Sequence, residues 1–164
     1  MDASIFVHAL RPAGKERIVG DVAEQVVCFP IDIALAAASM ITGGIAARHP
    51  GLRIAFSHGG GALPVMLPRI LQGAKTVPGG TDIYQEPADV TARRFFYDSA
   101  LYDPRALRFL IDTMGASQVV VGTDYPFWIH EREPLAAIAR AELAPEVVQA
   151  ITSHNALRFL GLAH

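Results

Sequence analysis

Four short apolar runs in this chain each end at a side chain that can ionise or bind a metal. The runs are continuously apolar instead of alternating with polar residues, which predicts strands buried on both faces, as in a parallel sheet covered by helices. In chain order they are "SIFV" (4–7) before His8, "RIAF" (53–56) before Ser57-His58, "FFY" (95–97) before Asp98, and "VVVG" (119–122) before Thr123-Asp124.

Helical segments lie between these runs. The clearest is 103–115, where Asp103 suits the N-cap, Pro104 the first turn and Gly115 the C-terminal cap. Other helices are expected at 33–48, at 62–74 with Pro64 in its first turn, and in the closing segment, whereas 9–33 reads as irregular and 118–124 as a strand. The alternation of strand and helix predicts an α/β fold, and residues 1–164 are expected to form a single domain.

The strand ends predict where a functional site lies. Carboxyl ends of parallel strands meet at one rim, and sites in parallel α/β folds are built there. We therefore expect His8, His58, Asp98 and Asp124 at that rim. Three glycines, 59–61, follow His58. They are interpreted as clearing space for a substrate beside the imidazole, with a tight strand-to-helix turn as the alternative.

Composition narrows the class of partner and the compartment. Hydrophobic residues make up 51% and charged residues 18% of the chain, and the net charge is −2 with scattered Lys and Arg, which favours neither a nucleic-acid nor a membrane partner. The apolar stretch 33–47 reads as too short to span a bilayer. Cys28 is the single cysteine, and no leader-like segment follows Met1, so a reducing, cytoplasmic location is expected.

Two linked segments resemble a known family. "HPGLRIAFSHGGGALPVMLPRI" (49–70) and "FFYDSALYDPRALRFLIDTMGASQVVVGTDYPF" (95–127) are similar to the later half of the amidohydrolase family 2 barrel, and within that family they resemble the aminocarboxymuconate semialdehyde decarboxylase-like enzymes. The resemblance implies a (β/α)8 TIM-type barrel with one metal ion, usually zinc. It also implies that this chain forms an incomplete barrel of about strands five to eight with their helices.

The same resemblance implies roles for five residues. His8 and Asp124 correspond to ligands of zinc or another divalent metal, and Asp124 also handles the proton of a bound water. His58 corresponds to the histidine that assists the chemistry beside the metal. Arg69 corresponds to an arginine that family dimers insert into the neighbouring subunit's site to hold a substrate carboxylate, with a surface charge as the alternative. Phe127 corresponds to an aromatic side chain that packs on the substrate.

One feature of the family pattern is absent. Strand one of the family carries a His-x-His pair of metal ligands, and no two of the six histidines here are separated by one residue. A complete barrel also needs about 250 residues. The first hypothesis is a metal-dependent hydrolase or decarboxylase acting on a small carboxylated substrate. The alternative is a truncated, catalytically silent relative that folds as an oligomer or pairs with a separate half-barrel chain. Unpaired sheet edges favour a homodimer in either case.

The remaining polar and aromatic candidates have simpler interpretations. His49 reads as a turn residue, His154 as part of a helix start capped by Ser153 or Asn155, and Cys28 as an inert small hydrophobe. Asp98 either orients a helix or forms hydrogen bonds at the rim, with a catalytic role as the alternative ranked below that of Asp124. His130 and Trp128 either line a pocket or pack, and packing is the commoner role of Trp.

Overall fold

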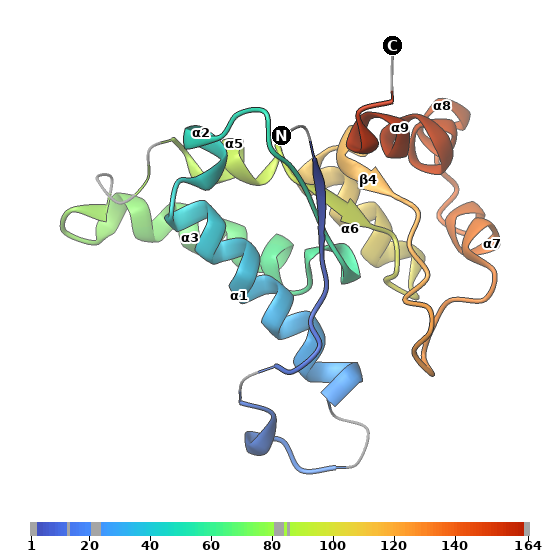
Figure 1. Ribbon diagram of the computed structural model, residues 1–164, viewed down its shortest axis with the longest axis horizontal. Helices are drawn as coiled ribbons and strands as arrows, with labels where there is room; N and C mark the ends of the chain where they lie inside the picture. Colours follow the sequence, from blue (N-terminus) through green and yellow to red (C-terminus); the bar gives the residue numbers. More distant parts are fainter. Residues whose placement is uncertain (1–2, 13, 21–23, 81–83, 85, 163–164) are drawn as a thin grey trace.

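The computed structural model describes residues 3–12, 14–20, 24–80, 84 and 86–162. Four parallel strands form one sheet in sequence order, and neighbouring strands are in register, with Ser4 opposite Arg53 and Tyr97 opposite Val119 (Figure 1). The strands are β1 (Ser4–Val7), β2 (Arg53–Phe56), β3 (Phe96–Asp98) and β4 (Val119–Val120). The predicted α/β class is confirmed.

The fourth strand is shorter than the predicted 118–124. Beyond Val120 the backbone leaves the ladder, and the Gly122 N–H donates to the Ser99 hydroxyl at 3.3 Å instead of to a strand. The backbone there passes so close to β3 that a Cβ on Gly122 would lie 2.5 Å from the Asp98 Cβ. This close approach turns the segment that leads to Asp124 toward the ends of the other strands.

The first long helix begins before the predicted position 33. Helix α1 (Phe29–Thr42) has Pro30 in its first turn and follows a π-helical turn, η2 (Glu24–Cys28). It ends at Gly43-Gly44, where Gly44 has φ 63°, and a short helix, α2 (Ile45–Arg48), continues the chain. The segment 9–33, predicted to be irregular, also contains a 3-10 turn, η1 (Lys15–Arg17). Pro30 is compatible with this early start, because the first turn of a helix needs no N–H at that position.

The helical run Glu24–Thr42 is long and apolar enough, by length and composition, to cross a membrane. The expectation about length concerned the stretch 33–47, whereas the helical run of 19 residues begins nine residues earlier. Within this structure, however, its inner side is part of the core: Phe29, Ile33, Ala37 and Ile41 are each at most 3% exposed. A helix that covers a sheet accounts for this pattern.

Later helices follow the predicted order. The Asp103 carboxylate caps helix α6 by accepting the Arg105 N–H at 2.7 Å, and Gly115 ends it at φ 100°, as predicted. The other elements are η3 (His58–Gly60), α3 (Leu63–Thr76), α5 (Ala88–Ala92), α6 (Pro104–Met114), η4 (Ala116–Gln118), α7 (Pro134–Ala139), α8 (Pro145–Gln149), η5 (Ala150–His154) and α9 (Asn155–Leu160).

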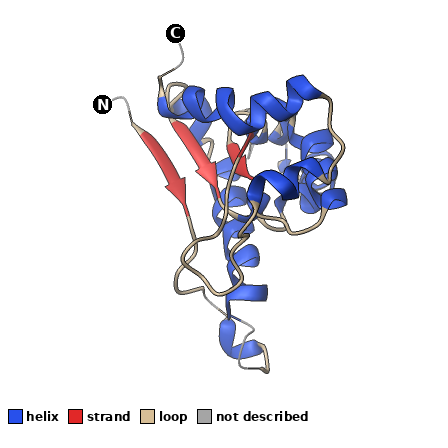
Figure 2. Cartoon of the chain, turned by 90° about the vertical axis from the view of Figure 1, so that its right-hand side faces the viewer, coloured by secondary structure: helices blue, strands red, loops and turns tan. Residues whose placement is uncertain are grey.

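The two faces of the sheet are covered unequally. Most helices gather on one side, where Ile54, Phe56 and Tyr97 join the main core (Figure 2). On the other face Ala55, Phe96 and Val120 form a small cluster with Phe159 of α9.

Strand β1 does not fit the prediction of burial on both faces. It lies at the outer edge of the sheet (Figure 2), and the side chains of Ile5 and Phe6 are 43% and 48% exposed. The prediction holds for β2, β3 and β4, which have neighbouring elements on both faces. Edge position alone does not explain this, since β4 is also an edge strand and is buried; among the described residues, Ile5 and Phe6 belong to neither core cluster, so apolar sequence alone did not produce burial.

Candidate metal centre

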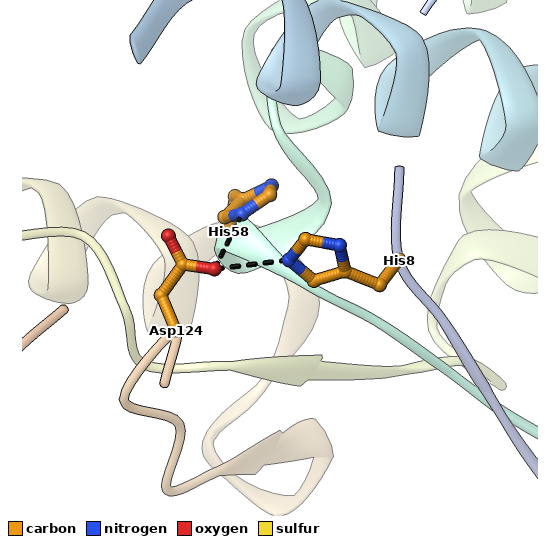
Figure 3. Close-up of side chains that lie close together, drawn as sticks. All are labelled: His8, His58 and Asp124. Atoms are coloured by element: carbon orange, nitrogen blue, oxygen red, sulfur yellow. Dashed lines mark hydrogen bonds and ion pairs between the residues drawn. The ribbon is translucent and has the colours of Figure 1, made fainter. Parts of the chain in front are cut away.

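Three side chains predicted from separate strand ends meet at one point (Figure 3). His8 follows β1, His58 follows β2, and Asp124 follows β4. The Nε2 atoms of His8 and His58 lie 2.9 and 3.2 Å from the same oxygen, Asp124 Oδ1. One potential ligand atom from each residue lies within 4.8 Å of the other two. The structure thus confirms that these side chains share a rim.

The backbone is strained at two of the three residues. His58 has φ 55° and Asp124 has φ 63°, in the left-handed region that side-chain-bearing residues seldom adopt. Such conformations cost on the order of 1–3 kcal/mol and persist where surrounding packing enforces them. Asp124 is 8% exposed and His58 5%, so both strained residues are held inside the protein.

The glycines after His58 have a different purpose from the predicted one. A Cβ on Gly59 would lie 2.8 Å from the Leu101 Cδ2, and one on Gly61 would lie 1.8 Å from the carbonyl oxygen of Pro30. The space beside these glycines is therefore filled by protein, and the interpretation that they make room for a substrate is wrong. The alternative, a tight turn between strand and helix, is correct for the backbone, although His58 is buried and not on the surface.

The protonation of His58 follows from its burial. Removal from water lowers the pKa of its imidazole, the negative charge and hydrogen bond of Asp124 oppose that change, and His8 lowers the pKa further. Burial prevails, so His58 is neutral at neutral pH. Its Nδ1 lies 3.3 Å from the Ser57 hydroxyl. A neutral imidazole next to a carboxylate can accept a proton and pass it on.

His8 is oriented by its other ring nitrogen. Its Nδ1 lies 2.6 Å from the carbonyl oxygen of Ala9, so Nδ1–H is the donor there. With the proton fixed on Nδ1, the Nε2 lone pair is available to a metal ion, an arrangement typical of histidine ligands. Imidazole nitrogen and carboxylate oxygen are donors that zinc and manganese both accept. The residues present therefore fit a divalent ion held by His8 and Asp124, with His58 beside it.

Asp98 does not join the cluster and instead fixes its support. Its carboxyl is 2% exposed, and one oxygen accepts the N–H groups of Gly59 at 3.0 Å and Ala100 at 3.2 Å. Burial, reinforced by the charge of Asp124, raises its pKa from 3.8 to about 6, against the two N–H donors. Asp98 thus ties the end of β3 to the turn after His58, which agrees with the orienting role expected for it.

Aromatic rings form one wall of the centre. Phe127 stacks on His8, with ring centroids 5.1 Å apart and planes 3° from parallel, and Phe29 meets His8 edge-on at 5.6 Å. A neighbouring cavity of about 400 Å³ is lined by Phe29, Phe127 and Trp128. Trp128 itself is 91% exposed to solvent. The substrate contact of Phe127 stays a prediction, but the ring lies directly against the predicted ligand.

Arg69 is not brought to this site. It is exposed on α3 and makes no hydrogen bond or ion pair with any described residue, so its predicted contact with a neighbouring subunit stays a prediction. His49 is exposed and Cys28 is buried, in line with their simpler interpretations, and His130 donates from Nδ1 to the Phe127 carbonyl oxygen at 2.7 Å. The predicted cap by Ser153 or Asn155 is wrong: the exposed His154 ends the π-helical turn η5, which runs directly into α9, and the Asn155 amide donates to carbonyl groups near β4.

One residue at the centre was missed by the sequence reasoning. The Tyr102 hydroxyl lies 3.4 Å from Asp124 Oδ2, the oxygen that neither histidine contacts. Burial and the charge of Asp124 raise the pKa of this phenol, so it remains a donor. The sequence feature that could have identified Tyr102 is its position in the loop that follows Asp98, at the same rim of the sheet.

A cluster of nitrogen and oxygen donors, with His58 and Asp124 buried and His8 partly buried, lies at the carboxyl ends of a parallel sheet and defines an α/β protein with a candidate metal centre. The amidohydrolase family model matches residues 1–162, and the chain belongs to the amidohydrolase family. The 2-amino-3-carboxymuconate-6-semialdehyde decarboxylase of Dictyostelium discoideum is 35% identical over 167 aligned residues, which cover 99% of this chain and 46% of the relative.

Solved structures support the barrel fold. A 5-carboxyvanillate decarboxylase from Sphingomonas paucimobilis matches with a TM-score of 0.79 at 24% identity, covering 96% of this chain and 49% of that one. A dihydroxybenzoic acid decarboxylase from Polaromonas sp. JS666, solved with bound manganese, matches with a TM-score of 0.78 at 18% identity, covering 98% and 50%. The chain thus spans about half the length of these proteins, and its four-stranded sheet is consistent with part of a TIM-type barrel.

Proposed function

We propose that this chain carries part of the active site of a metal-dependent decarboxylase that acts on a small carboxylated aromatic compound. The observation that carries the proposal is the meeting of His8, His58 and Asp124 at the carboxyl ends of parallel strands. The names of the relatives support decarboxylation over hydrolysis, since each of the three proteins compared above is called a decarboxylase. Within the barrel, we assign β1 to β4 to strands five to eight.

The reaction sets the tasks of the site. The bond between the carboxyl carbon and its neighbour breaks, the electron pair stays on the neighbouring carbon, that carbon takes a proton, and CO2 leaves. A bound divalent ion supplies positive charge for the substrate's oxygen atoms and lowers the pKa of a coordinated water. His8 and Asp124 would hold this ion, either zinc, as the family resemblance implies, or manganese, which the Polaromonas protein binds.

His58 is the residue best placed to move the proton. Because burial lowers its pKa, the ring is neutral near pH 7 and can take up a proton and release it again within one cycle. Its Nε2 faces Asp124 Oδ1, so a proton acquired by His58 is stabilised by the carboxylate. The stacked face of Phe127 and the adjoining cavity offer an apolar wall for a planar ring.

The second candidate function is a catalytically silent relative, and the small donor set of the described centre favours it. The described centre offers two imidazoles and one carboxylate, of which His58 is assigned to proton transfer. An ion held by His8 and Asp124 alone would be held weakly, because zinc sites generally have at least three protein ligands. Such a chain would act as a folded oligomer or as the partner of a separate half-barrel.

Self-association is the partner proposal common to both functions. Ile5 and Phe6, which point to opposite faces of β1, are 43% and 48% exposed and leave apolar side chains at this edge of the sheet. Burying them against a second copy would remove their apolar surface from water. The alternative dimer uses α3, where Val65 is 71% exposed one helical turn before Arg69, and directs Arg69 toward the neighbour's His58.

Metal content and CO2 release test the enzyme proposal. We expect protein purified without chelator to carry zinc or manganese and to release CO2 from at least one carboxylated phenol or from 2-amino-3-carboxymuconate-6-semialdehyde. His58→Gln should lower the rate at least 100-fold, in line with the contribution of general acid–base catalysis. The matched control is His49→Gln, which changes an exposed turn histidine and should leave the rate unchanged. Metal-free, inactive protein that does not respond to added ions would favour the silent relative.

Light scattering at micromolar concentration tests self-association, and a soluble monomer would contradict it. If the dimer uses α3, Arg69→Ala should weaken substrate binding while Arg93→Ala, an exposed arginine after α5, should not. Equal behaviour of the two variants would favour pairing through β1.

A further inference from the structure

Tyr102 lies at the metal centre without a part in the proposed reaction. Its hydroxyl is 3.4 Å from Asp124 Oδ2, whereas Oδ1 faces the Nε2 atoms of His8 and His58. The two oxygens of one buried carboxylate therefore have separate partners. In Figure 3 the dashed lines from both histidines end at the same oxygen of Asp124, Oδ1.

The loop that carries Tyr102 is fixed on both sides. On one side Leu101 packs closely on Gly59, since a Cβ on Gly59 would lie 2.8 Å from the Leu101 Cδ2. On the other side the Asp103 carboxylate accepts the Arg105 N–H at the start of α6. Between these two anchors Tyr102 has φ 60°, in the left-handed region. The anchored backbone sets where the Tyr102 side chain starts, and from there the ring, in a residue that is 48% exposed, reaches Asp124.

The carboxylate needs such a partner because rotation would change what it offers. An Asp side chain that turns about its last torsion presents either oxygen, or both, to an ion. A donor on Oδ2 selects one orientation, in which Oδ1 points at the two histidines. Hydrogen-bond partners of ligating carboxylates and imidazoles typically change metal affinity or activity 10- to 100-fold.

We infer that Tyr102 is a positioning residue of the metal centre, whose hydroxyl donates to Asp124 Oδ2 and so presents Oδ1 to the ion. The inference rests on the proposed function only in that the centre holds a divalent metal. It does not require that the chain decarboxylate anything. No bond to the ion is assigned to Tyr102 itself.

The test compares Tyr102→Phe with a matched control, Tyr125→Phe. Both changes remove one hydroxyl, but Tyr125 is 77% exposed and its hydroxyl has no hydrogen-bond partner in the described part of the chain. Binding of Mn²⁺ is measured from the paramagnetic resonance signal of the free ion. We expect the dissociation constant to rise about 10-fold or more for Tyr102→Phe and to stay unchanged for Tyr125→Phe. With Co²⁺ the visible absorption band should change in shape only for Tyr102→Phe, since the ligand geometry relaxes.

Thermal unfolding of the metal-free proteins separates positioning from stability, and all three should unfold at similar temperatures. Equal Mn²⁺ affinities for the unmodified chain and Tyr102→Phe would overturn the inference, as would a failure of the unmodified chain to bind Mn²⁺. CO2 release is measured separately, with protein saturated with Mn²⁺. A chain that binds Mn²⁺, loses affinity in Tyr102→Phe and yet releases no CO2 would refute the proposed function and leave the role of Tyr102 intact.

Discussion

Asp98 offers a test in which two opposing effects can be weighed. Its carboxyl is 2% exposed, which favours the neutral acid, yet one oxygen accepts two backbone N–H groups, which favour the anion. The pKa is raised from 3.8 to about 6, so burial prevails. At 1.36 kcal/mol per pKa unit, a rise of about 2 units corresponds to about 3 kcal/mol.

The sign of the pH dependence follows from proton binding. Between pH 3.8 and about 6 the folded chain retains a proton on Asp98 that the unfolded chain has released. The contribution of this group is therefore fully present below pH 3.8, and the free energy of unfolding falls as the pH rises through about 6. A loss of about 3 kcal/mol is large against a total stability of about 5–15 kcal/mol.

Asp98→Asn removes the titration and keeps an oxygen acceptor for the N–H groups of Gly59 and Ala100. We expect the free energy of unfolding of this variant, relative to the unmodified chain, to increase by about 3 kcal/mol between pH 4 and pH 7.5. Urea denaturation at a series of pH values measures this difference. Any constant cost of the buried amide cancels, because only the change with pH is compared.

The matched control is Asp112→Asn, which changes an exposed carboxyl on α6. Its difference from the unmodified chain should stay nearly flat over the same range. A flat or falling difference for Asp98→Asn would refute the reasoning, because it would mean that the two N–H donors outweigh burial and hold the carboxyl as an anion.

Two further substitutions test the supports of the site, each followed by urea unfolding. Gly61→Ala places a Cβ 1.8 Å from the Pro30 carbonyl oxygen at φ 60°, so it should destabilise the protein by more than about 3 kcal/mol. The control Gly73→Ala lies in the interior of α3, where a Cβ meets no atom within 4 Å, and should stabilise the protein by about 0.5–1 kcal/mol. Similar effects of the two substitutions would contradict the packing argument. Asn155→Ala removes a buried amide that donates to two carbonyls, one of them Val119 at 2.7 Å, and should cost about 2–3 kcal/mol; a cost below 0.5 kcal/mol would show that water replaces these bonds.

Much of the local structure was predictable because its causes lie within a few residues of each other. Asp103, Pro104 and Gly115 mark the ends of one helix through capping and allowed dihedrals, and the structure places them as expected. Continuous apolar runs predicted the strands, and the polar residue after each run predicted which side chains lie at the carboxyl-end rim of the sheet. His8, His58 and Asp124 of the candidate centre were therefore identifiable from the sequence alone.

The partners of each side chain depended on contacts between distant segments. That His8 and His58 share Asp124 Oδ1, and that Tyr102 contacts Oδ2, follows from the meeting of the four segments that come after the four strands. The glycines after His58 are required by Leu101 and the Pro30 backbone, which no local pattern connects to them.

Burial likewise belongs to the assembled fold. The runs at 4–7 and 53–56 are similarly apolar, yet Phe56 is fully buried while Phe6 is half exposed, because Phe56 packs within the main core and Phe6 belongs to neither core cluster of the described residues. Sequence determines which residues prefer to leave water. Only the tertiary structure decides which of them do, since burial requires a second surface to cover them.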